Sequence, residues 1–253
     1  MEFYFSYYNI IMSFELTKNK LSSQIMPYDN QVKKSDDPLP RSAGVIWIMS
    51  GKKGSGKSNL ILNVLKRKGS PYKKFYDNIF LISPTAGKDD KFKKFISELE
   101  KEGKYYDTLD ESIIDAVLAQ VKKFNEEFDE EEEGRKPENL LILDDCIHLM
   151  PKSNTISNIN QLFTTSRHNK LSVWVATQKY NKINPLIRAN ADLISFFRSD
   201  NRKEIATLID DINVDKKLFE QIYEFCTDEP NSFMHISLFG KIKFFKKFDK
   251  INI

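Results

Sequence analysis

The chain has few of the residues that build covalent or metal-based frameworks. Its 253 residues include only two cysteines, Cys146 and Cys226, and three scattered histidines. Two cysteines do not form the disulfide network of a small secreted scaffold, and the histidines lack the spacing of a metal site. We therefore expect a protein of a reducing compartment whose fold depends on an ordinary hydrophobic core.

Long apolar runs are also missing. No run approaches the ~20 residues that a membrane-spanning helix requires. The aromatic start, MEFYFSYYNIIM, has neither the basic flank nor the cleavage site of a signal peptide, and indicates a short edge strand or a partner-docking arm. Met12 is a second candidate for the start of translation. The sequence thus predicts no membrane partner and a protein that acts in the compartment where it is made.

Neither sign of charge is in large excess. Lys and Arg number 39 and Asp and Glu number 36, so the net charge is +3 and any contact with DNA must come from local basic patches. The length suits one large α/β domain or a domain with small extensions. Residues 33–41, KKSDDPLPR, mix charge and proline and predict a linker. We therefore expect an N-terminal extension at 1–43 and one domain at 44–253.

The segment from Gly44 to Ser58, GVIWIMSGKKGSGKS, carries the most informative pattern. An apolar run at 45–49 is typical of a buried strand, and the turn after it fits G-x-x-x-x-G-K-[ST], the phosphate-binding P-loop. Glycine lets the backbone curl around a triphosphate, and the curled N–H groups and the next helix attract phosphate. Lys57 is then expected to contact the β- and γ-phosphates, and the Ser58 hydroxyl to bind Mg²⁺. The predicted nucleotide-binding residues are Gly51, Lys52, Lys53, Gly54, Ser55, Gly56, Lys57, Ser58 and Asn59.

Short apolar runs alternate with amphipathic segments along the rest of the chain. Strands are predicted at 78–83, 140–143, 171–176 and 193–197, and helices at 58–68, 90–101, 112–128, 157–167, 203–210 and 215–226. This alternation predicts an α/β fold with a central, mostly parallel sheet flanked by helices. Together with the P-loop motif, it resembles the P-loop NTPases of the RecA/ASCE type. Residues 233–248 predict a C-terminal β-hairpin, and the acidic run 126–133 predicts a solvated loop.

Polar side chains follow two of the predicted strands. Asp144 and Asp145 follow LLIL, an apolar strand ending in two carboxylates, which is the Walker B pattern. Asp144 is expected to hold Mg²⁺ and Asp145 to polarise the attacking water. Gln178 ends the strand SVWVAT, and in a parallel sheet the carboxyl ends of the strands line the ligand crevice. We therefore expect Gln178 to contact the γ-phosphate or the lytic water.

Two arginines flank that strand in the sequence. Arg167 lies in TTSRHNK before it, and Arg188 lies in NPLIRANAD after it. Either guanidinium is a candidate arginine finger for the γ-phosphate of a neighbouring subunit. Arg167 is favoured, and Arg188 is the second candidate.

The blocks GKKGSGKS, FLISPT, LLILDD, SRHNKLSVWVATQ and IRANAD occur in this order. Together they resemble the poxvirus-type genome-packaging ATPases of large DNA viruses and virophages, within the FtsK–HerA superfamily; the compact size favours virophages. The resemblance covers about 44–199 and, more weakly, the C-terminal hairpin. It implies an Mg²⁺-dependent ATPase that forms a pentameric or hexameric ring and threads double-stranded DNA into a capsid, with Asp145 as catalytic carboxylate. It also implies capsid or portal partners and a location in the host cytoplasm, at the viral factory, and in the virion.

Other functions remain open at this point. A related ring helicase shares the same motifs, and a non-enzymatic, nucleotide-gated capsid assembly factor would need only nucleotide binding. A GTPase is disfavoured because residues 181–184, NKIN, lack the final Asp of the guanine-reading motif N-K-x-D. The basic tail 241–250 is a candidate DNA contact, although a solvated hairpin face is the preferred interpretation.

Overall fold

A computed structural model describes residues 4–7, 10–13, 37–42, 44–128, 136–146 and 158–252. The chain divides into two compact units, Met1–Lys33 and Lys34–Ile253. In the first unit, β1 (Tyr4–Tyr7) pairs antiparallel with β2 (Ile10–Ser13). The aromatic start of the chain therefore forms a hairpin of its own.

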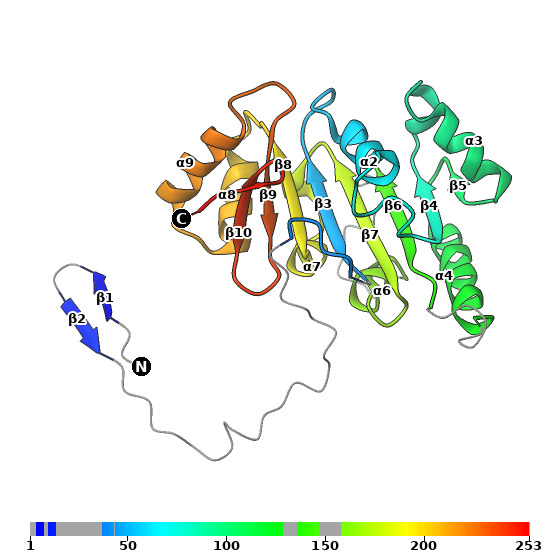
Figure 1. Ribbon diagram of the computed structural model, residues 1–253, viewed down its shortest axis with the longest axis horizontal. Coiled ribbons are helices and arrows are strands. Elements are labelled where there is room, and N and C mark those ends of the chain that lie inside the picture. The colour runs from blue at the N-terminus through cyan, green and yellow to red at the C-terminus, as the bar shows by residue number, and fades with distance from the viewer. Residues whose placement is uncertain are drawn as a thin grey trace, which may run out of the picture. The chain divides into compact units, whose positions relative to one another are not determined.

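The second unit is built on a nine-stranded sheet (Figure 1). Its strands are β3 (Ile46–Ser50), β4 (Asn78–Ile82), β5 (Tyr105–Tyr106), β6 (Asn139–Asp144), β7 (Leu171–Thr177), β8 (Leu193–Phe197), β9 (Phe233–Ser237), β10 (Lys243–Lys246) and β11 (Asp249–Lys250). They lie in the order β11-β10-β9-β8-β3-β7-β6-β4-β5. The six strands from β8 to β5 run parallel, and β9, β10 and β11 add antiparallel pairs at the other edge. The mostly parallel sheet and the C-terminal hairpin are confirmed.

Helices cover both faces of this sheet (Figure 1). They are α2 (Lys57–Lys66), α3 (Lys93–Lys101), α4 (Glu111–Glu126), α6 (Asn158–Thr164), α7 (Pro185–Ala189), α8 (Arg202–Ile212) and α9 (Lys216–Cys226), with 3₁₀ turns η1 (Ala86–Lys88) and η3 (Tyr180–Lys182). Buried residues of α2 and α3 pack with Trp47 and Trp174, whereas those of α4, α6, α8 and α9 pack with Ile48 and Val173. Because successive strand residues face opposite clusters, a strand covered on both sides must be apolar throughout.

The elements that sequence patterns miss are the short ones. β5 has two residues and α7 has five, too few for either periodicity to develop. Asn184 nevertheless caps α7, its side chain accepting a hydrogen bond from the Leu186 N–H, and Pro185 occupies the first helical position. The helix expected at 157–167 ends at Thr164, and the one expected from Asp90 begins at Lys93. Of the acidic run 126–133, residues 129–133 lie outside the described residues.

Part of the predicted linker packs on the sheet and helices of the second unit. Leu39 is buried in the same cluster as Trp47, and the Tyr72 hydroxyl donates to the Pro40 carbonyl at 2.8 Å. The buried His235 ring meets Pro38: its Nε2 lies 2.8 Å from the Pro38 carbonyl oxygen. Residues 37–42 therefore contribute to the core of the second unit.

His235 is held in its neutral form. Nε2–H donates to the Pro38 carbonyl, which leaves Nδ1 to accept from the Ser195 hydroxyl at 2.9 Å, while Trp47 Nε1–H donates to Ser195 Oγ at 3.1 Å. The ring is fully buried, and burial lowers the pKa of His235 to about 4. Protonation would place a second N–H against the Ser195 hydroxyl.

This burial predicts a pH-dependent stability. Unfolded His235 takes up a proton near pH 6.5 and folded His235 only near pH 4, so the stabilisation is complete above about pH 6.5 and is lost as the pH falls towards 4. The shift corresponds to about 3 kcal/mol. In urea denaturation, the stability difference between wild type and His235→Gln should shrink as the pH falls from 7 to 4.5. His168→Gln, at an exposed histidine, is the matched control and should follow wild type; a constant difference for His235→Gln would contradict the assignment.

Candidate functional site: a phosphate-binding loop at the carboxyl edge of the sheet

The turn after β3 has the backbone geometry of a phosphate loop. Gly54 and Gly56 have φ values of +80° and +110°, in the left-handed region that glycine adopts without strain. Gly51 is needed for another reason, since a Cβ there would lie 2.6 Å from Phe197 Cβ and 2.6 Å from Ser55 Oγ. Helix α2 begins directly after Gly56, so its first N–H groups face the loop.

The side chain of Lys57, the first residue of α2, folds back into the phosphate loop. Its Nζ donates to the Gly51 carbonyl at 2.6 Å and to the Lys52 carbonyl at 3.3 Å. The residue is 7% exposed, and burial lowers the pKa of Lys57 against the opposing influence of Asp145 and Asp144. A buried ammonium group is thus coupled to both carboxylates that the sequence singles out.

Asp144 is the buried member of the carboxylate pair. It ends β6, is 5% exposed, and accepts a hydrogen bond from Ser83 Oγ at 3.0 Å. Burial and the neighbouring Asp145 raise the pKa of Asp144 to about 6, although Ser83 and Lys57 oppose the shift. A positive charge added next to Asp144 would therefore strongly favour the ionised form of its carboxylate.

Asp145 faces the end of the next strand. Its backbone has φ +52°, a left-handed conformation that is strained for a residue with a side chain, and its N–H donates to the Ala176 carbonyl at 2.9 Å. Gln178 Nε2 donates to Asp145 Oδ2 at 3.0 Å. Thr177, just before Gln178, accepts from the Gly51 N–H at 3.1 Å. Lys57, Asp144, Asp145 and Gln178 therefore converge on one edge of the sheet.

The donor set at this edge fits Mg²⁺ with a nucleotide. The Ser58 hydroxyl, on the first turn of α2, and the Asp144 carboxylate are hard oxygen donors, and the buried Ser55 hydroxyl in the loop lacks a partner in the described part of the protein. The described residues contain no group of three or more His, Cys, Asp or Glu side chains that could hold a metal. Mg²⁺ suits such a sparse set because it keeps several waters and is shared with substrate phosphates.

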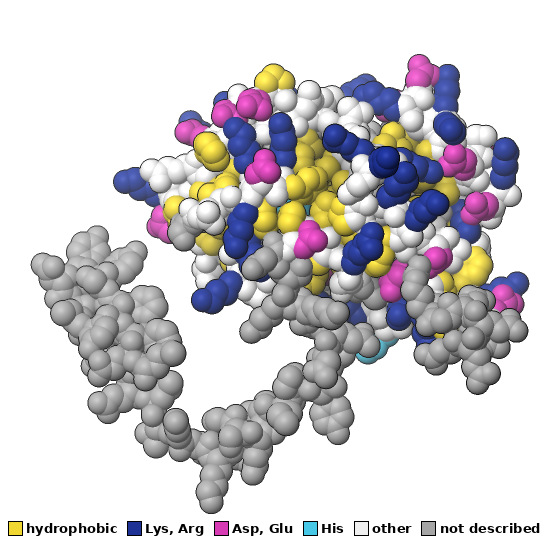
Figure 2. Space-filling view, in the orientation of Figure 1, with side chains coloured by type: hydrophobic (Ala, Val, Ile, Leu, Met, Phe, Trp, Pro, Cys, Tyr) yellow, Lys and Arg dark blue, Asp and Glu magenta, His cyan; other side chains and the backbone are white. Residues whose placement is uncertain are grey.

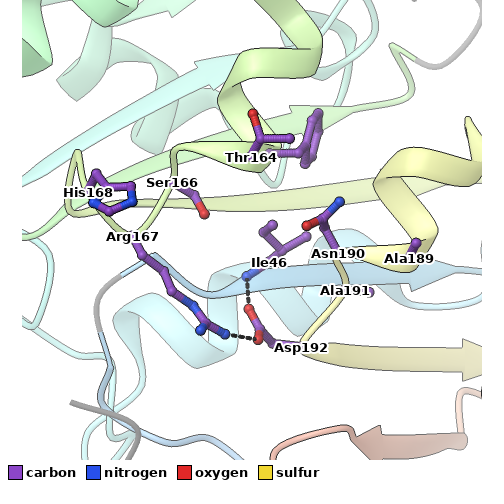
Figure 3. A pocket seen from close by; sticks show the side chains of 10 residues that line it. Ile46, Thr164, Ser166, Arg167, His168, Ala189, Asn190, Ala191 and Asp192 are labelled. Atoms are coloured by element: carbon purple, nitrogen blue, oxygen red, sulfur yellow. Dashed lines mark hydrogen bonds and ion pairs between the residues drawn. The ribbon is translucent and has the colours of Figure 1, made fainter. Parts of the chain in front are cut away.

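The two arginine candidates lie away from this edge. Arg167 precedes β7 and so lies at the amino edge of the sheet, where its Nη2 pairs with Asp192 Oδ1 at 3.0 Å (Figure 3). Asp192 also accepts from the Ile46 N–H, and the pocket beside the pair has a volume of about 310 Å³. Arg188 pairs with Asp211 at 2.7 Å and donates to the Ile183 carbonyl. Neither guanidinium is directed at the phosphate loop of its own chain.

Sequence reasoning missed Ser83. It follows β4 as Gln178 follows β7, it is fully buried, and it orients Asp144 while accepting from the Ala86 N–H at 3.0 Å. A polar residue directly after an apolar strand was the available signal, the one used for Asp144 and Gln178.

Comparison with known proteins agrees with this geometry. A family model described as "Poxvirus A32 protein" matches residues 42–238. The chain belongs to this family. It is 29% identical over 186 residues to the uncharacterized protein 075L of Invertebrate iridescent virus 6 and 24% identical over 186 residues to the uncharacterized protein L437 of Acanthamoeba polyphaga mimivirus. The matches cover 73% and 72% of this chain but only 66% and 63% of those proteins.

Solved structures share the fold of this Poxvirus A32 family member. The genome-packaging NTPase B204 of Sulfolobus turreted icosahedral virus 2, in complex with AMP, aligns with a TM-score of 0.60 at 19% identity, covering 81% of this chain and 98% of that chain. B204 of Sulfolobus turreted icosahedral virus, a DNA-packaging ATPase, aligns with a TM-score of 0.58 at 18% identity, covering 80% and 97%. In the described part of this family member, no helix is both long and apolar enough to cross a membrane.

Gly51→Ala should damage the phosphate loop. The added Cβ would press on Phe197 and Ser55, which we expect to destabilise the fold by about 1–3 kcal/mol and to weaken binding of a fluorescent ADP analogue at least tenfold. Gly103→Ala is the control, because its added Cβ would contact no atom and the only strain is the positive φ of +65°. This variant should bind the ADP analogue as wild type does. Unchanged ADP affinity in Gly51→Ala would remove this loop from the nucleotide site.

Proposed function

We propose that this chain is an Mg²⁺-dependent ATPase that works as a homo-oligomeric ring and translocates double-stranded DNA into a viral capsid. The family and the fold support the ATPase, and B204, which shares the fold, is a genome-packaging NTPase. The observation that carries the proposal is the hydrogen bond between Gln178 and Asp145 beside the phosphate loop. It joins two strand ends next to the loop, and this is where we propose that the terminal phosphoryl group of ATP binds.

Different residues are proposed to bind the phosphates and the Mg²⁺. The backbone from Gly51 to Ser58 is proposed to hold the phosphates, with Asn59 exposed at the start of α2 next to them. Ser58 and Asp144 are proposed to hold Mg²⁺, which when bound neutralises charge on the β- and γ-phosphates. Ser83 positions Asp144, because its hydroxyl fixes one carboxylate oxygen.

Asp145 is proposed to act on the attacking water. The carboxylate is partly exposed, it follows the buried Asp144, and the left-handed backbone turns it towards the end of β7. Gln178 holds one carboxylate oxygen and leaves the other to accept a proton from water. Lys57 supplies positive charge near the transferred phosphoryl group, where charge stabilisation contributes most to catalysis.

Arg167 is the better candidate for a finger that acts on a neighbouring subunit. Its side chain is 59% exposed, whereas the Arg188 side chain is 12% exposed and is engaged by Asp211 and the Ile183 carbonyl. An exposed guanidinium can reach another subunit, and its partner among the described residues, Asp192, would keep its bond to the Ile46 N–H. Capsid or portal proteins as partners, and the viral factory and virion as locations, belong to the same proposal.

The test of this function is the ATPase rate with and without double-stranded DNA. A motor should hydrolyse ATP faster on long duplex DNA. Unwinding of a forked duplex would favour the related ring helicase. Nucleotide binding without turnover, under both conditions, would favour the non-enzymatic assembly factor.

Two substitutions should separate binding from chemistry. Lys57→Ala should reduce turnover by roughly 100-fold or more without unfolding the chain, and Asp145→Asn should lose turnover but still bind ADP. Steady-state phosphate release and ADP binding measure the two effects. Lys203→Ala, at an exposed position on α8, is the control. Wild-type turnover in Lys57→Ala would exclude this site.

Arg167→Ala should poison mixed rings. If the finger acts between subunits, adding an equal amount of Arg167→Ala chains to wild type should reduce the ATPase rate well below half. Arg188→Ala should cost stability through the lost Asp211 pair but reduce the mixed rate only in proportion. The reverse pattern, or a proportional loss for Arg167→Ala, would reject Arg167 as the finger.

A further inference from the structure

Residues 66–74 form a densely basic segment of this protein. Residues 66–74, KRKGSPYKK, contain five Lys or Arg and no Asp or Glu. Because the whole chain has a formal charge of +3 and this basic segment has +5, the remaining residues carry a net charge of −2. Figure 2 shows Lys and Arg side chains gathered on the face that α2 and the loop after it cover.

Most of these cations are not neutralised. Lys66 pairs with Glu98 at 2.7 Å, but Arg67, Lys68, Lys73 and Lys74 are exposed. In the part of the chain that the structure describes, these four have no carboxylate within ion-pair distance.

The other basic candidate differs in this respect. In the C-terminal tail, Lys246 pairs with Asp228 at 2.7 Å and Lys247 with Glu229 at 3.5 Å. Local acids therefore pair with at least two of the five tail lysines, in agreement with the preferred interpretation of a solvated hairpin face. The basic segment differs from the tail because four of its five cations are exposed and unpaired within the described residues.

The basic segment is held on a rigid base. Tyr72 and Tyr76 are buried against Trp174, at ring distances of 5.6 and 5.8 Å, so Lys73 and Lys74 lie between two anchors. Lys74 has φ +59°, a conformation that a lysine seldom adopts unless the surrounding structure imposes it. A surface fixed before binding loses little conformational entropy when it meets a ligand.

The chemistry of the segment suits the phosphates of duplex DNA. Four of its five cations are lysines, compact point charges that contact phosphate without reading bases, as sequence-independent translocation requires. The segment also follows the helix that starts at the phosphate loop. The ten residues of α2 span about 15 Å, so a single helix joins Lys57 to Lys66.

We propose that the basic segment, residues 66–74, is a contact for the phosphate backbone of double-stranded DNA, linked through α2 to the nucleotide site. This assignment rests on the proposed function and adds the place where the DNA is held. Each phosphate contact contributes a slope of roughly −0.9 to the dependence of log affinity on log salt concentration. Removing four cations should therefore weaken duplex binding and make it less sensitive to salt.

The test compares two charge-matched variants of the full chain. One carries Arg67→Gln, Lys68→Gln, Lys73→Gln and Lys74→Gln. The control carries Lys182→Gln, Lys203→Gln, Lys216→Gln and Lys217→Gln, at exposed positions on η3, α8 and α9. Binding to a duplex of about 30 base pairs and arbitrary sequence is measured by fluorescence anisotropy. The salt concentration is varied between roughly 50 and 200 mM, where affinity that depends on phosphate contacts falls steeply.

We expect the segment variant to bind at least tenfold more weakly, with a salt slope shallower by about 2 to 4, and to lose DNA stimulation of its ATPase while keeping the basal rate. The control should change less than threefold. A third variant, Lys68→Arg with Lys73→Arg and Lys74→Arg, keeps the charge and should bind as wild type does.

The possible outcomes distinguish failure of the DNA contact at residues 66–74 from failure of the proposed motor function. If wild type binds the duplex and is stimulated but the segment variant behaves like the control, the assignment is overturned and the motor stands. If wild type neither binds nor is stimulated, the motor is overturned and the assignment with it. If the segment variant loses binding to phosphatidylserine vesicles but keeps duplex binding, the surface faces a membrane and the DNA assignment is overturned.

Discussion

The parallel ladder of β3, β7 and β6 is the constraint on which the site depends. Backbone bonds tie both halves of the site to β7: the Gly51 N–H donates to Thr177 and the Asp145 N–H donates to Ala176. All three strands are buried on both faces, so a shift in register would misplace a whole set of core side chains. The phosphate loop and the carboxylates therefore keep their relative positions because the core fixes the strands.

The site itself is costly to maintain. Burial disfavours the charged forms of both Lys57 and Asp144; Asp145 and Asp144 offset the penalty at Lys57, and the Ser83 hydroxyl and Lys57 offset it at Asp144. Asp145 adds a strained backbone angle next to them. Groups that oppose folding in this way are concentrated where binding of a charged ligand can use them, as is typical of functional sites.

The two edges of the sheet have different roles in this view. The carboxyl edge carries the proposed nucleotide site, whereas Arg167 and the entry to β4 lie at the amino edge. Helix α2 runs from one to the other, beginning at the phosphate loop and ending at the basic segment. A change at the phosphates therefore has a short, rigid connection to a surface at the far end of the same helix.

The sequence by itself determined the phosphate loop, the succession along the chain of most strands and helices, and the carboxylates Asp144 and Asp145, because these follow from local spacing and periodicity. It missed β5 and α7, because two- and five-residue elements have no period. It missed the role of Ser83, because the position after a strand does not reveal that the serine bonds Asp144, 61 residues away. Only the tertiary structure decided that β7 separates β3 from β6, that Gln178 bonds Asp145, and that the Arg188 side chain is occupied. Strand order and partner choice depend on contacts between residues far apart in the chain, and no local pattern encodes these.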